Sequence, residues 1–175
     1  MGNEAYEGFL SRRAIRKFKA DAVPKELVEK VIEAGLYAPS GMNWQSPIIV
    51  AISNPEVRAR LAADNAAIMN APAGTDPFYG APTILVVLAN RARPTYIYDG
   101  SCTMDNMLNA ANSLGLGSIW VHRAREVFNT PQWKEWLASI GVEGDYEGIG
   151  NCCIGYADIE ATAAERNPGR VFWVE

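Results

Sequence analysis

The segment Thr83 to Asn90 constrains the fold most, because it is the clearest strand pattern in the sequence. Its core, Ile84 to Ala89, carries apolar side chains at both odd and even positions, so both faces of the strand should be covered. We therefore predict a strand at the centre of its sheet. An apolar run of this length is far short of the ~20 residues that cross a bilayer, so we expect no membrane segment.

The segments around this strand alternate between helical and strand patterns. Helices are expected at residues 3–11, 24–38, 55–69 and 102–114, with a short one opening at Thr130-Pro131, and strands at 48–52, 118–121 and 149–156. Asp99 or Ser101 is expected to cap the fourth helix. The order predicts an α+β fold with a mixed sheet flanked by helices, and 175 residues predict a single domain, 1–175.

The C-terminal run Val171-Phe172-Trp173-Val174 is apolar and strand-like. In a chain of this size such a run should be covered, either by its own sheet or by a second subunit. Trp133 and Trp136 are expected in the core or at a subunit contact.

Charge and cysteine content narrow the function classes. The formal net charge is −4 and the pI about 5.1, which disfavours nucleic acid as the main partner, because such binding neutralises many phosphates. The cysteines Cys102, Cys152 and Cys153 are odd in number and none lies in a CxxC pair, so neither a disulfide framework nor a zinc site is expected. The N-terminus carries acidic residues where a secretory signal has basic ones, and we expect a cytoplasmic protein.

The segment Arg12 to Phe18 concentrates positive charge in this acidic protein. Four of its residues are cationic, namely Arg12, Arg13, Arg16 and Lys17. Adjacent guanidinium groups offer planar pairs of donors that suit a phosphate group. The alternatives are a solvated basic patch and a basic patch that binds RNA or another polyanion.

Residues Pro39 to Pro47 form a second candidate binding segment, a loop rich in turn formers and in amide and hydroxyl side chains. Such loops cap elements or bind ligands. The sequence has no GxGxxG, Walker, GxSxG or HExxH motif, and its single histidine, His122, lacks a nearby nucleophile signature. An enzyme with this sequence would depend on a bound cofactor for its chemistry.

Several separated segments together resemble the FMN-dependent nitroreductase family. They are Arg12 to Phe18, Ala38-Pro39-Ser40-Gly41-Met42-Asn43-Trp44-Gln45, Gly115-Leu116-Gly117-Ser118-Ile119-Trp120, and the tail Arg166-Asn167-Pro168. The resemblance covers nearly the whole chain, in order and at the family's spacings. It implies a nitroreductase-like fold with a central, mainly antiparallel mixed sheet, and a C-terminal segment that extends over a partner subunit.

The resemblance also implies a homodimer with two FMN sites at the interface, each built from both subunits. Arg12, Arg13 and Arg16 would hold the phosphate and ribityl chain, with Arg166 closing on the phosphate. Ala14 stands where the family usually has serine or threonine, so its backbone would make the contact. The partner subunit would contribute Pro39, Ser40, Gly41, Asn43 and Gln45 to the ring, and Trp120, Val121 and His122 would run beside it. A backbone N–H near His122 would face flavin N5.

The activity implied is transfer of hydride from NAD(P)H through FMN to a small electron-poor acceptor, such as a nitroaromatic or quinone, by a ping-pong mechanism without a catalytic side chain. Relatives also catalyse reductive dehalogenation, enone reduction or flavin fragmentation, and a non-catalytic flavin-binding protein is a further alternative. The choice between NADH and NADPH, the physiological acceptor, the roles of Asp99 and the His122 side chain, and a lid at residues 70–80 stay open. Larger relatives carry an asparagine and a lysine near the flavin in that segment, and this sequence has no clear match.

Overall fold

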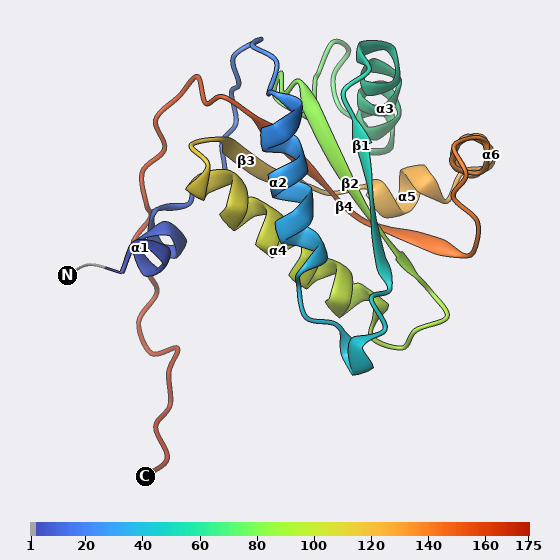
Figure 1. Cartoon of the computed structure of the whole chain (residues 1–175). Coiled ribbons are helices and arrows are strands. Elements are labelled where there is room, and N and C mark those ends of the chain that lie inside the picture. Colours follow the sequence, from blue (N-terminus) through green and yellow to red (C-terminus); the bar gives the residue numbers. More distant parts are fainter. Residues whose placement is uncertain (1–2) are drawn as a thin grey trace.

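A computed structural model describes residues 3–175, and its centre is a four-stranded antiparallel sheet (Figure 1). The strands are β1 (Pro47–Ile52), β2 (Thr83–Asn90), β3 (Gly117–Val121) and β4 (Tyr146–Gly155), and they lie in the order β1-β2-β4-β3. β2 pairs with β1 on one side and β4 on the other. The prediction of a central strand is therefore confirmed, with the predicted bounds.

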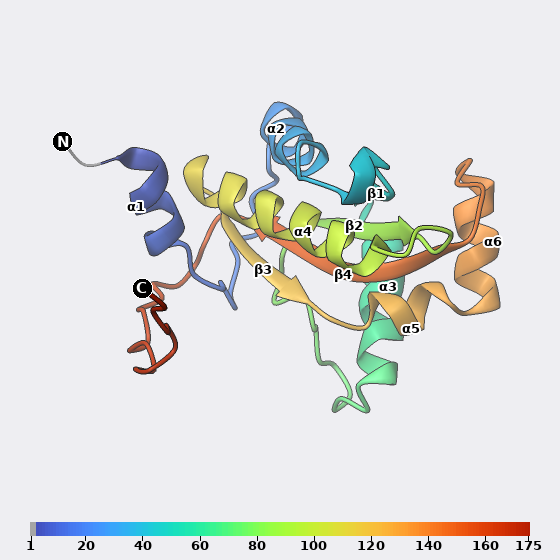
Figure 2. The same ribbon diagram turned by 90° about the horizontal axis from the view of Figure 1, so that it is seen from below.

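Helices cover both faces of the sheet (Figure 2). One face packs against α2 (Lys25–Leu36) and α4 (Tyr96–Ser113), and the other against α3 (Pro55–Ile68), α5 (Ala124–Phe128) and α6 (Pro131–Ser139). Leu85 and Val87 of β2 face the first group, whereas Ile84, Val86 and Leu88 face the second. This two-sided core confirms the α+β prediction.

Local sequence signals explain where two helices begin. The Asn3 side chain accepts hydrogen bonds from Ala5 N and Tyr6 N at the start of α1 (Glu4–Ser11). The Asn54 side chain does the same for Glu56 N and Val57 N, and Pro55 occupies the first turn of α3. These side chains satisfy N–H groups that have no partner within the helix.

The starts of one helix and one strand differ from the sequence predictions, and one helix was not predicted. α4 begins at Tyr96 rather than Cys102, so neither Asp99 nor Ser101 caps it. Gly100 lies inside this helix and lets it approach Ile149 closely, since a Cβ there would lie 2.5 Å from Ile149 Cγ1. β4 begins at Tyr146, three residues before the predicted strand, and the short α5 was not predicted.

The C-terminal tail leaves the body of the molecule (Figure 1). Its apolar residues are almost fully exposed, with Phe172 at 88% and Trp173 at 83%. The tail therefore does not complete the sheet of its own chain, and cover by a second subunit stays a prediction. Within residues 3–175, no helix combines the length and apolar character needed to cross a membrane.

Candidate functional site

The arginine-rich segment lies directly beside β3. Ala14 forms an isolated parallel bridge with Ser118, and Ile15 N donates to Ser118 O at 3.0 Å. A Cβ on Gly117 would come within 3.0 Å of the Ile15 side chain, so glycine allows this close approach. The fold thus brings together two of the segments singled out in the sequence, and Arg12 and Arg13 are half-buried there while Arg16 is exposed.

Arg13 is held at the C-terminal end of α1 through its Nη1. Its Nη1 donates to Leu10 O at 2.7 Å and to Arg12 O at 2.8 Å, which satisfies carbonyls at the helix end. Its Nε is buried and has no hydrogen-bond partner in the described part of the chain. Arg13 also lines a hollow of about 270 Å³ with Gly117, Ser118 and Ala161. A buried guanidinium N–H without a partner fits a site that an anionic group completes.

A larger cavity of about 510 Å³ lies at the end of β3, lined by Trp120, His122, Arg123 and Ile149 among others. The indole of Trp120 packs over Gly150, where a Cβ would leave no room, and its Nε1 is buried without a hydrogen-bond partner among the residues that the structure describes. The His122 side chain is exposed, with its ring centroid 5.8 Å from that of Trp120. Val121 is buried.

The backbone at His122 is held by two buried asparagines that the sequence reading missed. Asn65 Nδ2 donates to His122 O at 2.9 Å, and Asn151 Nδ2 donates to the same oxygen at 3.2 Å. Arg123, the next residue, has φ of +79°, in the left-handed region. The available signal was a polar residue inside an otherwise apolar strand, at Asn151, and on the buried face of a helix, at Asn65.

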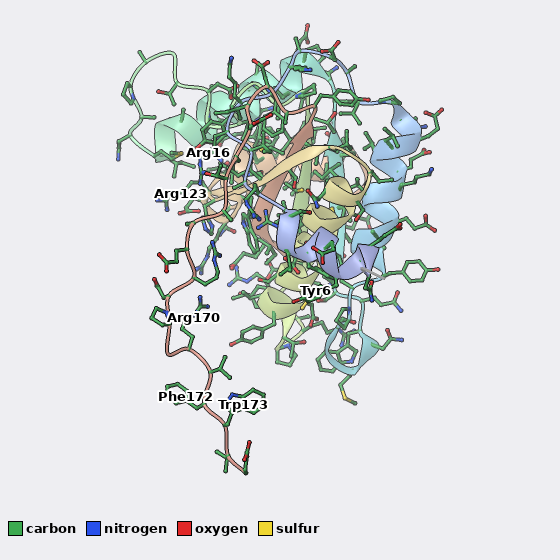
Figure 3. The ribbon with its side chains drawn as sticks, turned by 90° about the vertical axis from the view of Figure 1, so that its left-hand side faces the viewer. Tyr6, Arg16, Arg123, Arg170, Phe172 and Trp173 are labelled. Carbon is green, nitrogen blue, oxygen red and sulfur yellow. The ribbon has the colours of Figure 1, made fainter. Side chains whose placement is uncertain are left out.

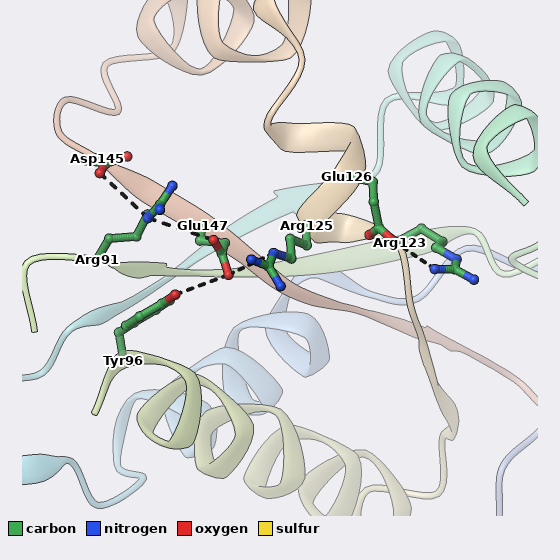
Figure 4. Close-up of polar contacts among 7 residues, drawn as sticks. All are labelled: Arg91, Tyr96, Arg123, Arg125, Glu126, Asp145 and Glu147. Atoms are coloured by element: carbon green, nitrogen blue, oxygen red, sulfur yellow. Dashed lines mark hydrogen bonds and ion pairs between the residues drawn. The ribbon is translucent and has the colours of Figure 1, made fainter. Parts of the chain in front are cut away.

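Glu147 is a second feature missed by the sequence reading, and it lies in the wall of the same cavity. Its side chain is only 3% exposed, and it accepts from the Tyr96 hydroxyl at 3.3 Å (Figure 4). Arg125 Nε lies 3.2 Å and Arg91 Nε 3.8 Å from its carboxylate oxygens. Two guanidinium groups compensate the buried charge. Glu147 thereby joins the ends of β2, α4, α5 and β4.

The loop Pro39–Gln45 is fixed by Asp99. Asp99 Oδ1 accepts from Gly41 N at 2.9 Å, and its Oδ2 accepts from Ser46 Oγ at 2.8 Å and Thr95 Oγ1 at 3.1 Å. The buried Asp99 is therefore a tie for this loop rather than a helix cap. Three side-chain-bearing residues of the loop have left-handed backbones, namely Met42, Asn43 and Gln45. Such strain persists where surrounding contacts impose it, and it is common at binding sites.

Within one chain, the loop Pro39–Gln45 lies far from the arginine-rich segment. The loop is tied to Asp99 near the start of α4, whereas Asn112, thirteen residues later, holds Gly8 O of α1 at 3.0 Å. At 1.5 Å per residue, the two ends are about 20 Å apart along α4. Pro39, Ser40 and Gln45 line a separate hollow of about 150 Å³.

Arg166 is also apart from the other arginines. It lies in the exposed tail and donates from Nε and Nη2 to Ala164 O, at 3.1 and 2.6 Å. Figure 3 shows this tail, with Arg170, Phe172 and Trp173, running away from the body on which Arg16 and Arg123 lie. Within one chain, the structure thus joins residues 12–16 to residues 117–122 and leaves residues 39–45 and Arg166 elsewhere.

Comparisons with known proteins show which family the chain belongs to. Residues 10–156 match the Nitroreductase family. The chain is 30% identical over 178 residues to an NADPH-flavin oxidoreductase of Vibrio harveyi, covering 97% of this chain and 72% of the relative. It is 25% identical over 167 residues to an NADPH-dependent oxidoreductase of Staphylococcus epidermidis, covering 81% of this chain and 65% of that one.

Solved structures extend the likeness to the whole fold. A nitroreductase with bound FMN from Bacteroides fragilis superimposes with a TM-score of 0.88 at 26% identity, covering 99% of this chain and 100% of that one. A second, from Desulfitobacterium hafniense, has the same fold, with a TM-score of 0.90 at 24% identity and full coverage of both chains. On the family match and this shared fold, the chain belongs to the nitroreductase family.

Proposed function

We propose that the protein is an FMN-dependent oxidoreductase that uses NAD(P)H to reduce small electron-poor molecules. The observation that carries the proposal is the Arg12–Arg16 segment bridged to β3, with a buried Arg13 N–H that has no hydrogen-bond partner among residues 3–175. The B. fragilis structure, which covers 99% of this chain, contains FMN, and the V. harveyi and S. epidermidis relatives are named as NADPH-dependent enzymes. These names support both the cofactor and the reductant.

The phosphate of FMN would bind at the arginine segment. A phosphate near −2 needs at least two guanidinium partners to leave water at modest cost, and Arg12 and Arg13 are adjacent and half-buried. Backbone N–H groups at Ala14 would add donors. Arg166 would close on the phosphate from the tail.

The isoalloxazine ring would lie along Trp120, Val121 and His122, beside the cavity at the end of β3. When bound, FMN supplies the redox chemistry, accepting hydride from NAD(P)H and passing it to a nitroaromatic, quinone or related acceptor in a ping-pong cycle. The chain's own residues orient the ring and shape the cavity in which donor and acceptor alternate. No protein acid or base is required, because water can supply the proton.

A second copy of the chain would complete each site. The loop Pro39–Gln45 lies about 20 Å along α4 from the end that holds the arginine segment, so a partner subunit is the simplest source of its ring contacts. The exposed apolar tail needs cover of the kind that a partner provides. We therefore propose a homodimer with FMN at the interface. A cytoplasmic setting is part of the proposal, and the unpaired thiols of the three cysteines support it.

The proposal is tested first with the purified protein. We expect a yellow protein that releases FMN on denaturation and whose flavin absorbance bleaches under anaerobic NADH or NADPH. A panel of nitroaromatics, quinones, enones and halogenated phenols would then separate the proposed acceptors from the dehalogenase and enone reductase alternatives. Flavin that is bound but not reduced by either nicotinamide would indicate a storage protein, and absence of bound flavin would reject the proposal.

The phosphate clamp is tested by the double substitution Arg12→Ala and Arg166→Ala. Losing two charge-assisted contacts of about 1.5–3 kcal/mol each should weaken FMN binding at least ~100-fold, measured by fluorescence titration of the apoprotein. The control replaces the exposed lysines Lys25 and Lys134, which lie on α2 and α6, by alanine. Unchanged FMN affinity in the arginine variant would refute the clamp.

A further inference from the structure

The carbonyl of His122 is held by two buried side-chain amides from distant parts of the chain. Asn65 on α3 and Asn151 on β4 are both 0% exposed, and the Nδ2 of each donates to His122 O, at 2.9 and 3.2 Å. Asn151 Nδ2 also donates to Val121 O at 3.2 Å. This carbonyl is therefore fixed in direction by two rigid elements of the core.

Burying the two asparagine amides costs folding free energy, so stability alone does not explain their presence. The Oδ1 atoms of Asn65 and Asn151 are both buried without a hydrogen-bond partner in the described part of the chain. A buried polar atom without a partner costs about 1–3 kcal/mol, and an apolar side chain of similar volume would avoid that cost. The two amides are thus better explained by what they impose on the backbone than by their net contribution to folding.

The direction imposed on the carbonyl also sets the direction of the next N–H. In a planar trans peptide the C=O and N–H bonds point in opposite directions. With His122 O directed inward to Asn65 and Asn151, the Arg123 N–H is directed away from the core. His122 and Arg123 both line the cavity of about 510 Å³. No hydrogen bond from Arg123 N to a described residue is present.

The strain at Arg123 is consistent with an imposed peptide orientation. Its φ of +79° is unfavourable for a residue with a Cβ. A left-handed arginine persists only where the surroundings over-determine it. The two amide hydrogen bonds just before it supply that constraint.

We propose that Asn65 and Asn151 are positioning residues that hold the His122–Arg123 peptide so that the Arg123 N–H is presented to N5 of the flavin. The inference rests on the proposed function and names the residues that act on the ring. In oxidised flavin N5 is a hydrogen-bond acceptor, whereas after hydride uptake N5 carries hydrogen and loses that contact. A fixed N–H therefore favours the oxidised cofactor and lowers its tendency to accept hydride.

The test compares Asn65→Leu and Asn151→Leu with the wild type, all as FMN-loaded protein. Freeing the peptide should weaken binding of oxidised FMN relative to reduced FMN by at least about tenfold, which raises the two-electron potential by about 30 mV. The Arg123 amide ¹H–¹⁵N resonance should shift on FMN binding in the wild type and shift much less in the variants. The control, Asn106→Leu, removes an equivalent amide contact, Asn106 Nδ2 to Ala34 O at 3.0 Å, that joins α4 to α2.

Failure of this inference is distinguishable from failure of the proposed function. Wild-type protein that binds no flavin would overturn both. Wild-type protein that binds and reduces flavin, with variants of unchanged potential and unchanged Arg123 amide shift, would overturn the positioning role alone. If a leucine variant does not fold, Asn65→Ala takes its place, because it removes the Nδ2 donor without added bulk and allows the same measurements of potential and amide shift.

Discussion

A single carboxylate, Asp76, determines much of the conformation of the irregular segment before β2. It accepts from Arg58 Nη2 at 2.6 Å, from Phe78 N at 3.0 Å and from Gly80 N at 2.8 Å. Burial acts to raise the pKa of Asp76, but the hydrogen bonds from Arg58, Gly80 and Phe78 outweigh it, so the net pKa is lowered. We therefore expect residues 76–80 to stay tied to α3, with any lid movement confined to residues 70–75.

Asp76 should make stability depend on pH in the acid range. A carboxyl whose folded pKa lies below its ordinary value of 3.8 contributes stability above that value and loses it as pH falls through the folded pKa. Asp76→Asn should lower the free energy of unfolding at pH 7 by about 1–3 kcal/mol. Urea unfolding should show the difference between the two proteins shrinking as the pH falls below about 4.

The control for Asp76 is an exposed ion pair. Asp158→Asn breaks a contact of 2.7 Å with Lys17 in which both side chains are exposed, at 65% for Lys17 and 41% for Asp158. Such pairs contribute little, so the unfolding midpoint should hardly change. An Asp76→Asn variant as stable as the wild type at pH 7 would show that the segment does not depend on this carboxylate.

At the scale of helices and strands, the sequence predictions were correct where short-range signals determine the structure. β2 is apolar on both faces and is central, and Asn54-Pro55 starts α3 as an N-cap and first-turn proline. The predicted start of α4 was wrong: the helix begins at Tyr96, and the missed part contains Gly100, which packs on Ile149, nearly fifty residues later. Long-range packing of this kind leaves no local pattern.

The residues of the candidate site divide in the same way, into those that local sequence signals identified and those whose roles depend on tertiary contacts. The sequence singled out Arg12–Arg16 and Trp120–His122, and the structure brings these segments side by side through Ala14 and Ser118. It did not single out Asn65 or Glu147, because their roles arise from tertiary neighbours such as His122 O and Arg125. The positions of Pro39–Gln45 and Arg166 at a flavin depend on a second copy of the chain, so they stay predictions.

Two glycine substitutions test the close packing of α4 on β4. In Gly100→Ala the new Cβ would lie 2.5 Å from Ile149 Cγ1, and the overlap should cost about 1–3 kcal/mol, more than the ~1 kcal/mol that alanine gains in a helix. In Gly8→Ala, on α1, the nearest atom would be Ser113 Oγ at 4.0 Å, so the helix gain of about 0.5–1 kcal/mol should remain. Thermal unfolding should therefore move in opposite directions for the two variants. A stabilised Gly100→Ala protein would mean that Ile149 moves aside freely.

At the scale of the whole molecule, large apolar side chains are exposed on α1 and on the C-terminal tail. α1 exposes Tyr6, Phe9 and Leu10 at 58%, 63% and 53%, and the tail exposes Phe172 and Trp173 almost completely. Patches of this kind mark interaction surfaces. Together with the separation of residues 39–45 from the arginines, they make a second copy of the chain the expected occupant.

The tail gives this expectation its sharpest test. Phe and Trp side chains each bury about 150–250 Å² when covered, so removing both from each tail should cost several kcal/mol of association. Phe172→Ala with Trp173→Ala should therefore weaken the dimer at least ~100-fold, measured by sedimentation equilibrium over a range of protein concentrations. The matched control, Tyr98→Ala, removes an aromatic side chain that is 72% exposed at the start of α4 and tests whether any exposed aromatic has the same effect.

FMN affinity should fall together with dimer stability in the tail variant, because loss of the partner would also remove the Pro39–Gln45 contacts. A tail variant that stays dimeric at nanomolar concentration and retains its flavin would show that the apolar end of the chain is not part of the subunit contact.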